Sequence, residues 1–213
     1  KVAMPMILAT SAVHSHLTRK GLRTFTSLNV RSAECVDPHY FAVIIGAGAT
    51  VVNAYLAEDS LADRIERGLL EGSLTEIVSR YRNAIDQGLL KIMAKMGISV
   101  ISSYRGGLNF EAVGLSRAMC AEYFPGLISR ISGIGVSGVQ KKTTAIHTKG
   151  WGSTDTILPI GGFYKSRRSG ETHAWEAQSM HMMQAACSKA SYDLWKQYSA
   201  RMQANPPIHL RDL

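Results

Sequence analysis

The sequence is poor in cysteine and has no long apolar runs, and both shortages limit what the chain can be. Its 213 residues contain three cysteines, Cys35, Cys120 and Cys187, which lie far apart and form no C-x-x-C pair. This odd, dispersed set predicts reduced thiols and disfavours a zinc site or a disulfide framework. No apolar run approaches the roughly 18 residues that a membrane-spanning helix needs, and no signal peptide is recognisable. We therefore expect a cytoplasmic protein with no membrane partner.

Sequence motifs for nucleotide phosphates and for nucleophilic catalysis are also missing. There is no P-loop, and no serine sits in a recognisable nucleophile elbow. The run Gly46-Ala-Gly-Ala-Thr50 looks like a dinucleotide-binding motif, but its glycines follow a predicted helix and precede a predicted strand. That order is the reverse of a phosphate-binding turn, so a helix stop with close packing explains the glycines better. His14, next to Val13 on an apolar face, is expected to be a hydrogen-bonded core histidine.

Acidic residues are scarce relative to basic ones, with 16 Asp and Glu against 24 Lys and Arg and a formal net charge of +8. A nucleic-acid surface would gather this excess in clusters with aromatic residues. The one tight basic cluster is Lys165, Arg167 and Arg168. A basic interdomain face explains the same composition, so we expect no nucleic-acid partner. A basic RNA-binding module is an alternative interpretation of the excess charge. Such a module would bind RNA with an affinity that falls steeply as the salt concentration rises.

Hydrophobic periodicity predicts short strands that alternate with helices over the first 100 residues. The expected strands are 4–9, 24–30, 50–53 and 98–101, and the expected helices are 10–19, 37–45, 55–69 and 75–95. Strands and helices that alternate across short loops form parallel pairs with right-handed crossovers. The predicted fold class is therefore α/β, with parallel β/α units resembling part of a (β/α) barrel.

The pattern changes after residue 135, which predicts a second region. We expect a helix over 136–151, a hairpin or irregular β element over 157–170 and helical structure over 175–203, with a linker at Pro206 and Pro207. This divides the chain into a β/α segment, residues 1–135, and a C-terminal helical and irregular β connector, residues 136–213.

The most informative segment runs from Gly88 to Gly114. It indicates the end of an amphipathic helix, a buried strand, a polar loop over Ser102–Gly107 and a further helix near Phe110. In β/α proteins the loop that follows a strand's carboxyl end is where binding groups gather, and this loop contains Tyr104 and Arg105. A solvated turn without chemistry explains the same polar residues.

Two other positions near this loop are candidates for a structural or a binding role. Glu111, at the start of the expected helix, is placed to cap that helix or to pair with Arg105, so we interpret it as a residue that fixes the loop. The run Ser129–Gly135, with Arg130, either presents N–H groups to a phosphate or is a plain buried strand and turn. Together with the 102–107 loop, this run supports an alternative function, an autonomous phosphate- or FMN-binding half-barrel.

Long collinear motifs make the chain resemble the large (alpha) subunit of glutamate synthase. The segment from Gly88 to Gly114 is similar to the family's K-[IV]-M-[SA]-K-M-G-I-S helix end, followed by S-Y-[RK]-G and F-E-A-V-G-L. Further similar segments are residues 5–14 (PxLLATxAVH) with 21–23 following in register, 37–49 (H-x-F-A-x-L-x-G-x-G-A), 129–135 (SRIGG), 170–174 (GExHA) and 210–213 (LRDL). The resemblance places the chain in the C-terminal part of the central domain and its connection to the FMN-binding domain. We therefore expect a piece of a longer polypeptide.

The resemblance implies an oxidoreductase that converts glutamine, 2-oxoglutarate and a reductant into two glutamates. It implies FMN, an iron–sulfur cluster and NADPH or ferredoxin in the parent enzyme. The implied partners are the amidotransferase and FMN domains of the same polypeptide, together with a reductase subunit or ferredoxin.

The family's catalytic N-terminal cysteine, cluster cysteines and FMN-contacting stretch have no counterpart in this sequence. We therefore expect no catalytic, cofactor-binding or metal residue in the segment, and an inactive fragment when it is alone. The resemblance suggests a scaffold between the amidotransferase and flavin sites. Tyr104, Arg105 and Asn109 are our candidates for lining the ammonia path or an interdomain surface.

Overall fold

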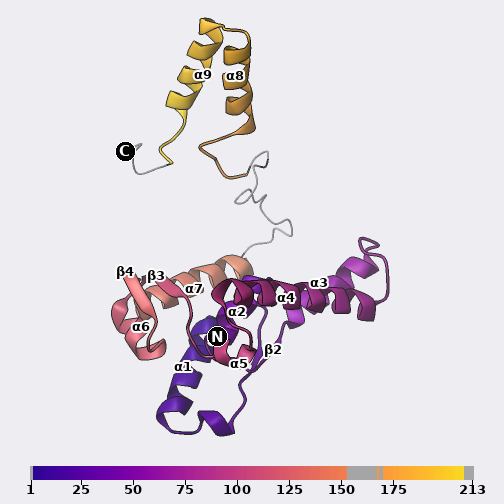
Figure 1. Ribbon diagram of the computed structural model, residues 1–213, viewed down its shortest axis with the longest axis vertical. Helices are drawn as coiled ribbons and strands as arrows, with labels where there is room; N and C mark the ends of the chain where they lie inside the picture. Colours follow the sequence, from indigo (N-terminus) through magenta and orange to yellow (C-terminus); the bar gives the residue numbers. More distant parts are fainter. Residues whose placement is uncertain (1, 153–166, 168–169, 209–213) are drawn as a thin grey trace. The chain divides into compact units, whose positions relative to one another are not determined.

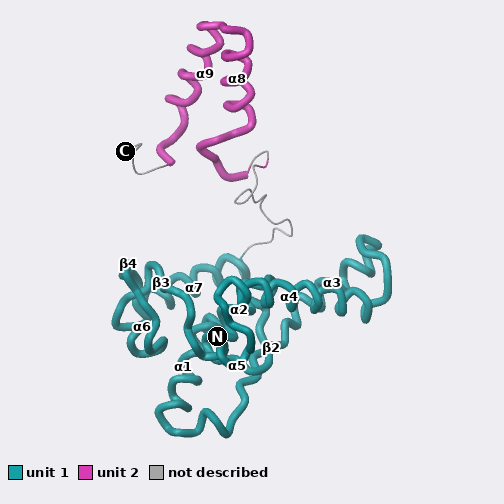
Figure 2. The backbone as a smooth tube through the Cα atoms, in the orientation of Figure 1, with its two compact units in different colours: residues 1–152 teal, residues 153–213 magenta. Residues whose placement is uncertain are grey.

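The computed structural model describes residues 2–152, 167 and 170–208. The chain forms two compact units, residues 1–152 and 153–213 (Figure 2). The sequence analysis divides the chain at residue 135 by role, into a β/α segment and a connector. That division stays a prediction. No helix in the described ranges is both long and apolar enough to cross a membrane.

Two β-α-β units with parallel strands form the α/β part of unit 1 (Figure 1). In the first, β1 (Asn29–Arg31) pairs in parallel with β2 (Val51–Asn53), and α2 (Pro38–Gly46) connects them. Asp37 caps α2 by accepting hydrogen bonds from the backbone N–H groups of the first turn, with Pro38 at the first helical position, as the sequence predicts.

The second β-α-β unit joins β3 (Glu111–Leu115) in parallel to β4 (Ile128–Ile134) through α6 (Arg117–Tyr123). In the described residues each strand pair is a separate two-stranded sheet. The parallel pairing confirms the α/β class, and the short pairs are compatible with partial β/α units. β4 is mostly exposed, with Ile128 and Ile131 facing solvent, so the expectation of a buried strand at 129–135 is wrong.

The longest helix, α4 (Leu74–Met96), is confirmed as an amphipathic helix. Its start is fixed by a capping box between Ser73 and Glu76, and its end by Gly97 in the left-handed conformation. The buried face of α4 includes Ile85, which joins α2 residues in the main core cluster. Strand β2 and helix α2 thus both pack with residues of α4 in one core cluster.

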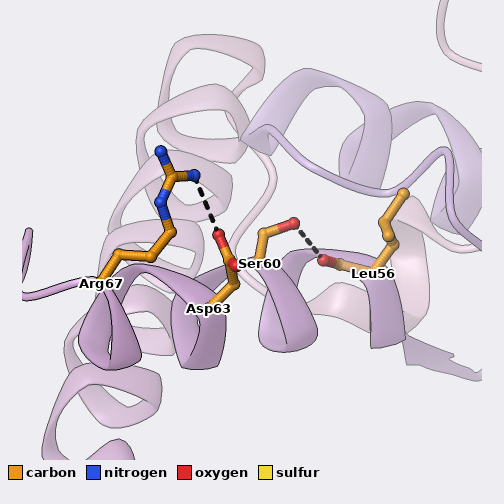
Figure 3. Close-up of polar contacts among 4 residues, drawn as sticks. All are labelled: Leu56, Ser60, Asp63 and Arg67. Atoms are coloured by element: carbon orange, nitrogen blue, oxygen red, sulfur yellow. Dashed lines mark hydrogen bonds and ion pairs between the residues drawn. The ribbon is translucent and has the colours of Figure 1, made fainter. Parts of the chain in front are cut away.

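Helix α3 (Tyr55–Glu66) also packs on α4, and local polar contacts follow its length. Figure 3 shows two of them, in which the Ser60 hydroxyl donates to the Leu56 carbonyl and Arg67 pairs with Asp63 at 3.3 Å. Because Arg67 and Asp63 are both exposed, this pair adds little stability.

The strand predicted over residues 4–9 is wrong, because those residues begin α1 (Met6–Arg19). The buried face of α1 includes Leu8, Ser11 and Ser15, which follow a helical spacing. Both serine hydroxyls donate to the Tyr123 carbonyl, at 2.7 Å and 3.4 Å. The helix therefore buries a polar stripe that a hydrophobic pattern does not register.

The strand predicted over residues 24–30 is largely wrong. A 3-10 turn, η1 (Arg23–Phe25), occupies its start, and only Asn29–Arg31 is extended and paired. Phe25 is 85% exposed, so this β-rich run contains no continuous buried side.

The strand over 98–101 and the helix near Phe110 are also wrong. Residues 101–104 form the short helix α5 (Ile101–Tyr104), and the predicted helix is replaced by β3. Val100 and Ile101 are exposed, and only Ile98 packs on a buried cluster. A short apolar run does not distinguish a strand from other buried segments.

Helix α7 (Val136–Gly152) confirms the helix expected after residue 135. Unit 2 contains two packed helices, α8 (Ala177–Ser188) and α9 (Tyr192–Ala204), in place of one continuous helical stretch. Arg201 of α9 pairs with Glu176 at 2.8 Å. The β element predicted over 157–170 and most of the basic cluster around Arg167 lie outside the described residues.

Candidate functional site

The 105–110 loop is attached to the carboxyl end of α2. The backbone N–H of Gly106 donates to the Ile45 carbonyl at 3.1 Å, and the N–H of Leu108 donates to the Gly46 carbonyl at 3.2 Å. Carbonyl groups in the last turn of a helix lack hydrogen-bond donors within the helix. The N–H groups of the loop supply those donors. A Cβ at Gly46 would lie 2.7 Å from Cε1 of Phe110, which shows how closely the ring covers the helix end.

The imidazole of His14 lies between two glycine turns that are distant in sequence. A Cβ at Gly106 would lie 2.9 Å from Cε1 of His14, and a Cβ at Gly48 would overlap the same ring. Both glycines have positive φ, +72° at Gly106 and +120° at Gly48. Only glycine combines that backbone conformation with such a close approach. His14 therefore joins α1 to the α2 turn and to the 105–110 loop.

Arg23 holds His14 in place and completes the cluster. Its Nε–H donates to Nδ1 of His14 at 2.9 Å, and Nη2 donates to the Gly48 carbonyl at 2.8 Å and to Thr50 Oγ1 at 3.3 Å. Nη1 donates to the Thr26 carbonyl at 2.7 Å. The planar guanidinium thus connects α1, η1 and the start of β2. We call His14, Arg23, Gly48 and Gly106 the hub.

The hydrogen bond from Arg23 fixes the protonation of His14. A guanidinium only donates, so Nδ1 must be the unprotonated nitrogen of a neutral imidazole. Burial lowers the pKa of His14, and the nearby Arg23 charge lowers it further. The hub therefore requires a neutral histidine. The expected hydrogen bond is confirmed, but His14 is half-buried and is not a core residue.

The three sequence candidates of the loop take different positions. Tyr104 is 4% exposed and packs with Ala42 and Met93, and burial raises the pKa of its hydroxyl. Arg105 and Asn109 are exposed. The 105–110 loop therefore follows a packed residue, Tyr104 at the end of α5, and has a polar outer side at Arg105 and Asn109.

The loop-fixing role predicted for Glu111 is wrong. Glu111 lies in β3, so there is no helix start for it to cap, and its Oε1 is 3.5 Å from Nε of Arg130. That pair is exposed and joins the two strands β3 and β4, so we expect it to add little stability. Backbone hydrogen bonds to Ile45 and Gly46 fix the loop instead.

Sequence reasoning missed Arg23 and treated His14 and Gly48 as separate packing positions. Their only common signal is that each lies in one of the family-like motifs, residues 5–14, 21–23 and 37–49. The structure brings these motifs together around one side chain, although about 90 residues separate His14 from Gly106.

The described residues do not fit a metal or cluster site. Within them, no three His, Cys, Asp or Glu side chains come together as ligands. Cys35 and Cys120 are buried free thiols, and Cys187 is an exposed one. Burial raises the pKa of Cys35 to about 11, which leaves it protonated and poorly suited to bind iron.

We expect Gly106→Ala to destabilise unit 1 more than Gly21→Ala does. Both glycines have nearly the same φ, +72° and +69°, but a Cβ at Gly21 meets nothing within 4 Å. Each alanine should cost about 1 kcal/mol of backbone strain, and overlap with His14 should add about 1–3 kcal/mol at Gly106 only. Urea unfolding measures both. Equal losses in the two variants would contradict the close packing of His14.

The lowered pKa of His14 predicts a loss of stability in weak acid. The unfolded chain binds the proton first, near the ordinary value of 6.5, so the contribution of His14 is complete above that pH and is lost as pH falls through the folded-state pKa. The charge of Arg23 opposes protonation of the imidazole. Unfolding free energies measured from pH 8 to pH 5 should fall more for the wild type than for His14→Gln, and parallel curves would exclude this role.

Comparison with known proteins identifies the family. The model of the family described as glutamate synthase central domain matches residues 1–116. The chain is 56% identical over 214 residues to the glutamate synthase (NADPH) large chain of Azospirillum brasilense, and 41% identical over 212 residues to that of Bacillus subtilis (strain 168). It is 34% identical over 224 residues to the ferredoxin-dependent glutamate synthase of Pyropia yezoensis.

These matches cover 100%, 99% and 100% of the chain but only 14%, 14% and 15% of the three relatives. The chain thus spans about one seventh of the length of the relatives that it matches. The hub and its loop lie within the matched residues 1–116. The chain belongs to the glutamate synthase central-domain family.

Proposed function

We propose that this chain is the central-domain segment of a glutamate synthase large chain and acts there as a scaffold. In this proposal the parent enzyme forms two glutamates from glutamine, 2-oxoglutarate and a reductant. The segment lies between its amidotransferase and flavin sites. The observation that carries the proposal is the match of the chain, over its whole length, to one part of much longer glutamate synthases.

The physical character of unit 1 supports a role inside a larger assembly. Its strand pairs are short, and two-stranded sheets are marginally stable alone. Apolar strand residues remain uncovered, with Val113 70% and Ile131 63% exposed. Such surfaces suit a segment that other parts of a polypeptide cover.

The 105–110 loop is the part of the scaffold that we propose to border the ammonia path or an interdomain surface. Arg105 and Asn109 would face that space, and Tyr104 would form its buried base. Ammonia must stay unprotonated to react as a nucleophile, so its path has to exclude bulk water. A loop fixed by backbone hydrogen bonds and by the hub can hold such a wall in one conformation.

The FMN, the iron–sulfur cluster and the NADPH or ferredoxin reductant of the parent enzyme are assigned to its other parts. The proposed partners are the amidotransferase and FMN domains of the same polypeptide, and a reductase subunit or ferredoxin. The described cysteines do not fit cluster ligation, as the buried Cys35 thiol illustrates. The residues of this chain would position the two sites without taking part in the chemistry.

The alternative, an autonomous phosphate- or FMN-binding half-barrel, is less well supported by the loop geometry. The backbone N–H groups of Arg105, Gly106 and Gly107 already donate to the carbonyls of Ile101, Ile45 and Tyr104. They are therefore not free to bind a phosphate. Titration of the chain with FMN, followed by flavin fluorescence, separates the two, because saturable one-to-one binding would favour the alternative.

The scaffold role predicts that Arg105→Ala uncouples the two half-reactions in the full-length enzyme. Glutamine hydrolysis should exceed 2-oxoglutarate consumption, because a wall of the path is opened and ammonia escapes. The measurement is the ratio of glutamine consumed to 2-oxoglutarate consumed. Arg64→Ala, which removes an exposed arginine from α3, is the control. Full coupling in the Arg105 variant would rule out this role for the loop.

A further inference from the structure

The side of the hub that carries the loop has an excess of positive charge. Arg23 binds His14, and the backbone of Gly106, next to Arg105, lies against the same imidazole ring. The Arg23 guanidinium and the backbone next to Arg105 thus both contact the His14 imidazole, and the like charge of Arg105 acts on Arg23. Among the described residues, no hydrogen bond or ion pair links Arg23 or Arg105 to a carboxylate.

This arrangement is electrostatically unfavourable as it stands. Burial lowers the pKa of Arg23, and the like charge of Arg105 lowers it further. Three other arginines of the described residues have an acidic partner, Arg67, Arg130 and Arg201, the last of which pairs with Glu176 at 2.8 Å. The neutral imidazole, carbonyl and hydroxyl groups around Arg23 orient its guanidinium but do not balance its charge.

The two arginines differ in how free they are to bind. Arg23 uses Nε, Nη1 and Nη2 within the hub, so it supplies mainly charge and a fixed position. The exposed side chain of Arg105 has no hydrogen-bond partner in the described residues. Its planar donor fork matches the two oxygens of a carboxylate and permits a bidentate pair. The rigid loop holds the backbone of Arg105 next to the fixed charge.

We propose that Arg105, beside Arg23 and the imidazole of His14, forms a carboxylate-binding site on the hub. The carboxylate comes either from a small free acid or from an Asp or Glu side chain elsewhere in a longer polypeptide. The site concerns the same loop as the proposed function but does not depend on it, because carboxylate binding requires no coupling between half-reactions.

The test is the thermal stability of the 213-residue chain in sodium glutarate, compared with sodium chloride at equal ionic strength and a pH of about 8, where His14 is neutral. Glutarate should raise the melting temperature saturably in the wild type and in the Arg64→Gln control. Loss of one charge-assisted pair should weaken the apparent affinity of Arg105→Gln about tenfold or more. Bound carboxylate should also raise the pKa of His14, followed by NMR and assigned with His14→Gln.

The same variants in the full-length large chain separate the two sources. If a side chain fills the site, Arg105→Gln lowers the melting temperature without added glutarate, and the wild type does not respond to glutarate. If a free acid fills it, the full-length wild type responds as the short chain does.

The proposal is overturned if Arg105→Gln behaves like Arg64→Gln in both proteins. Should the short chain not unfold cooperatively, the full-length comparison decides alone. Coupling of the half-reactions is measured separately, so a failure of carboxylate binding leaves the scaffold proposal standing, and the reverse also holds.

Discussion

The hydrogen bond between Arg23 and His14 is the interaction on which the arrangement of unit 1 depends. One guanidinium contacts a helix, a 3-10 turn and the start of a strand, and the imidazole that it orients fills the space between two glycine turns. The β1–β2 pair is only three residues long on each side, so it cannot position these elements by itself. In a complete β/α domain a large sheet positions the helices and loops. Here the polar hub positions them.

This dependence explains why glycine is required where the chain segments meet. At Gly48 and Gly106 the backbone replaces a side chain as the surface against which His14 packs, and both residues have positive φ. The loop that follows is then fixed by the carbonyls at the end of α2. The order of contacts runs from Arg23 to His14, then to the glycines, and finally to Arg105 and Asn109 on the outer side.

Elements with strong local signals could be predicted from the sequence. Helix α2 has Asp37 and Pro38 at its start, and α4 has a helical apolar period that ends at Gly97. Helix α1 was missed at its first turn because residues 6–9 form a short apolar run, which does not distinguish a strand from a buried helix. The loop predicted over residues 102–107 was located only in part, because residues 101–104 form α5. The hub was not predicted, because no spacing in a single sequence shows that residues 14, 23, 48 and 106 meet.

The most direct test of the hub is a double-mutant cycle with His14→Ala, Arg23→Gln and the double variant, measured by urea unfolding at a pH of about 8. We expect a coupling free energy of about 1–2 kcal/mol, because each single change leaves the other partner without its hydrogen bond. If the losses of unfolding free energy in the two single variants sum to the loss in the double variant within about 0.3–0.5 kcal/mol, the two residues act independently. That result would contradict the claim that this pair organises the site.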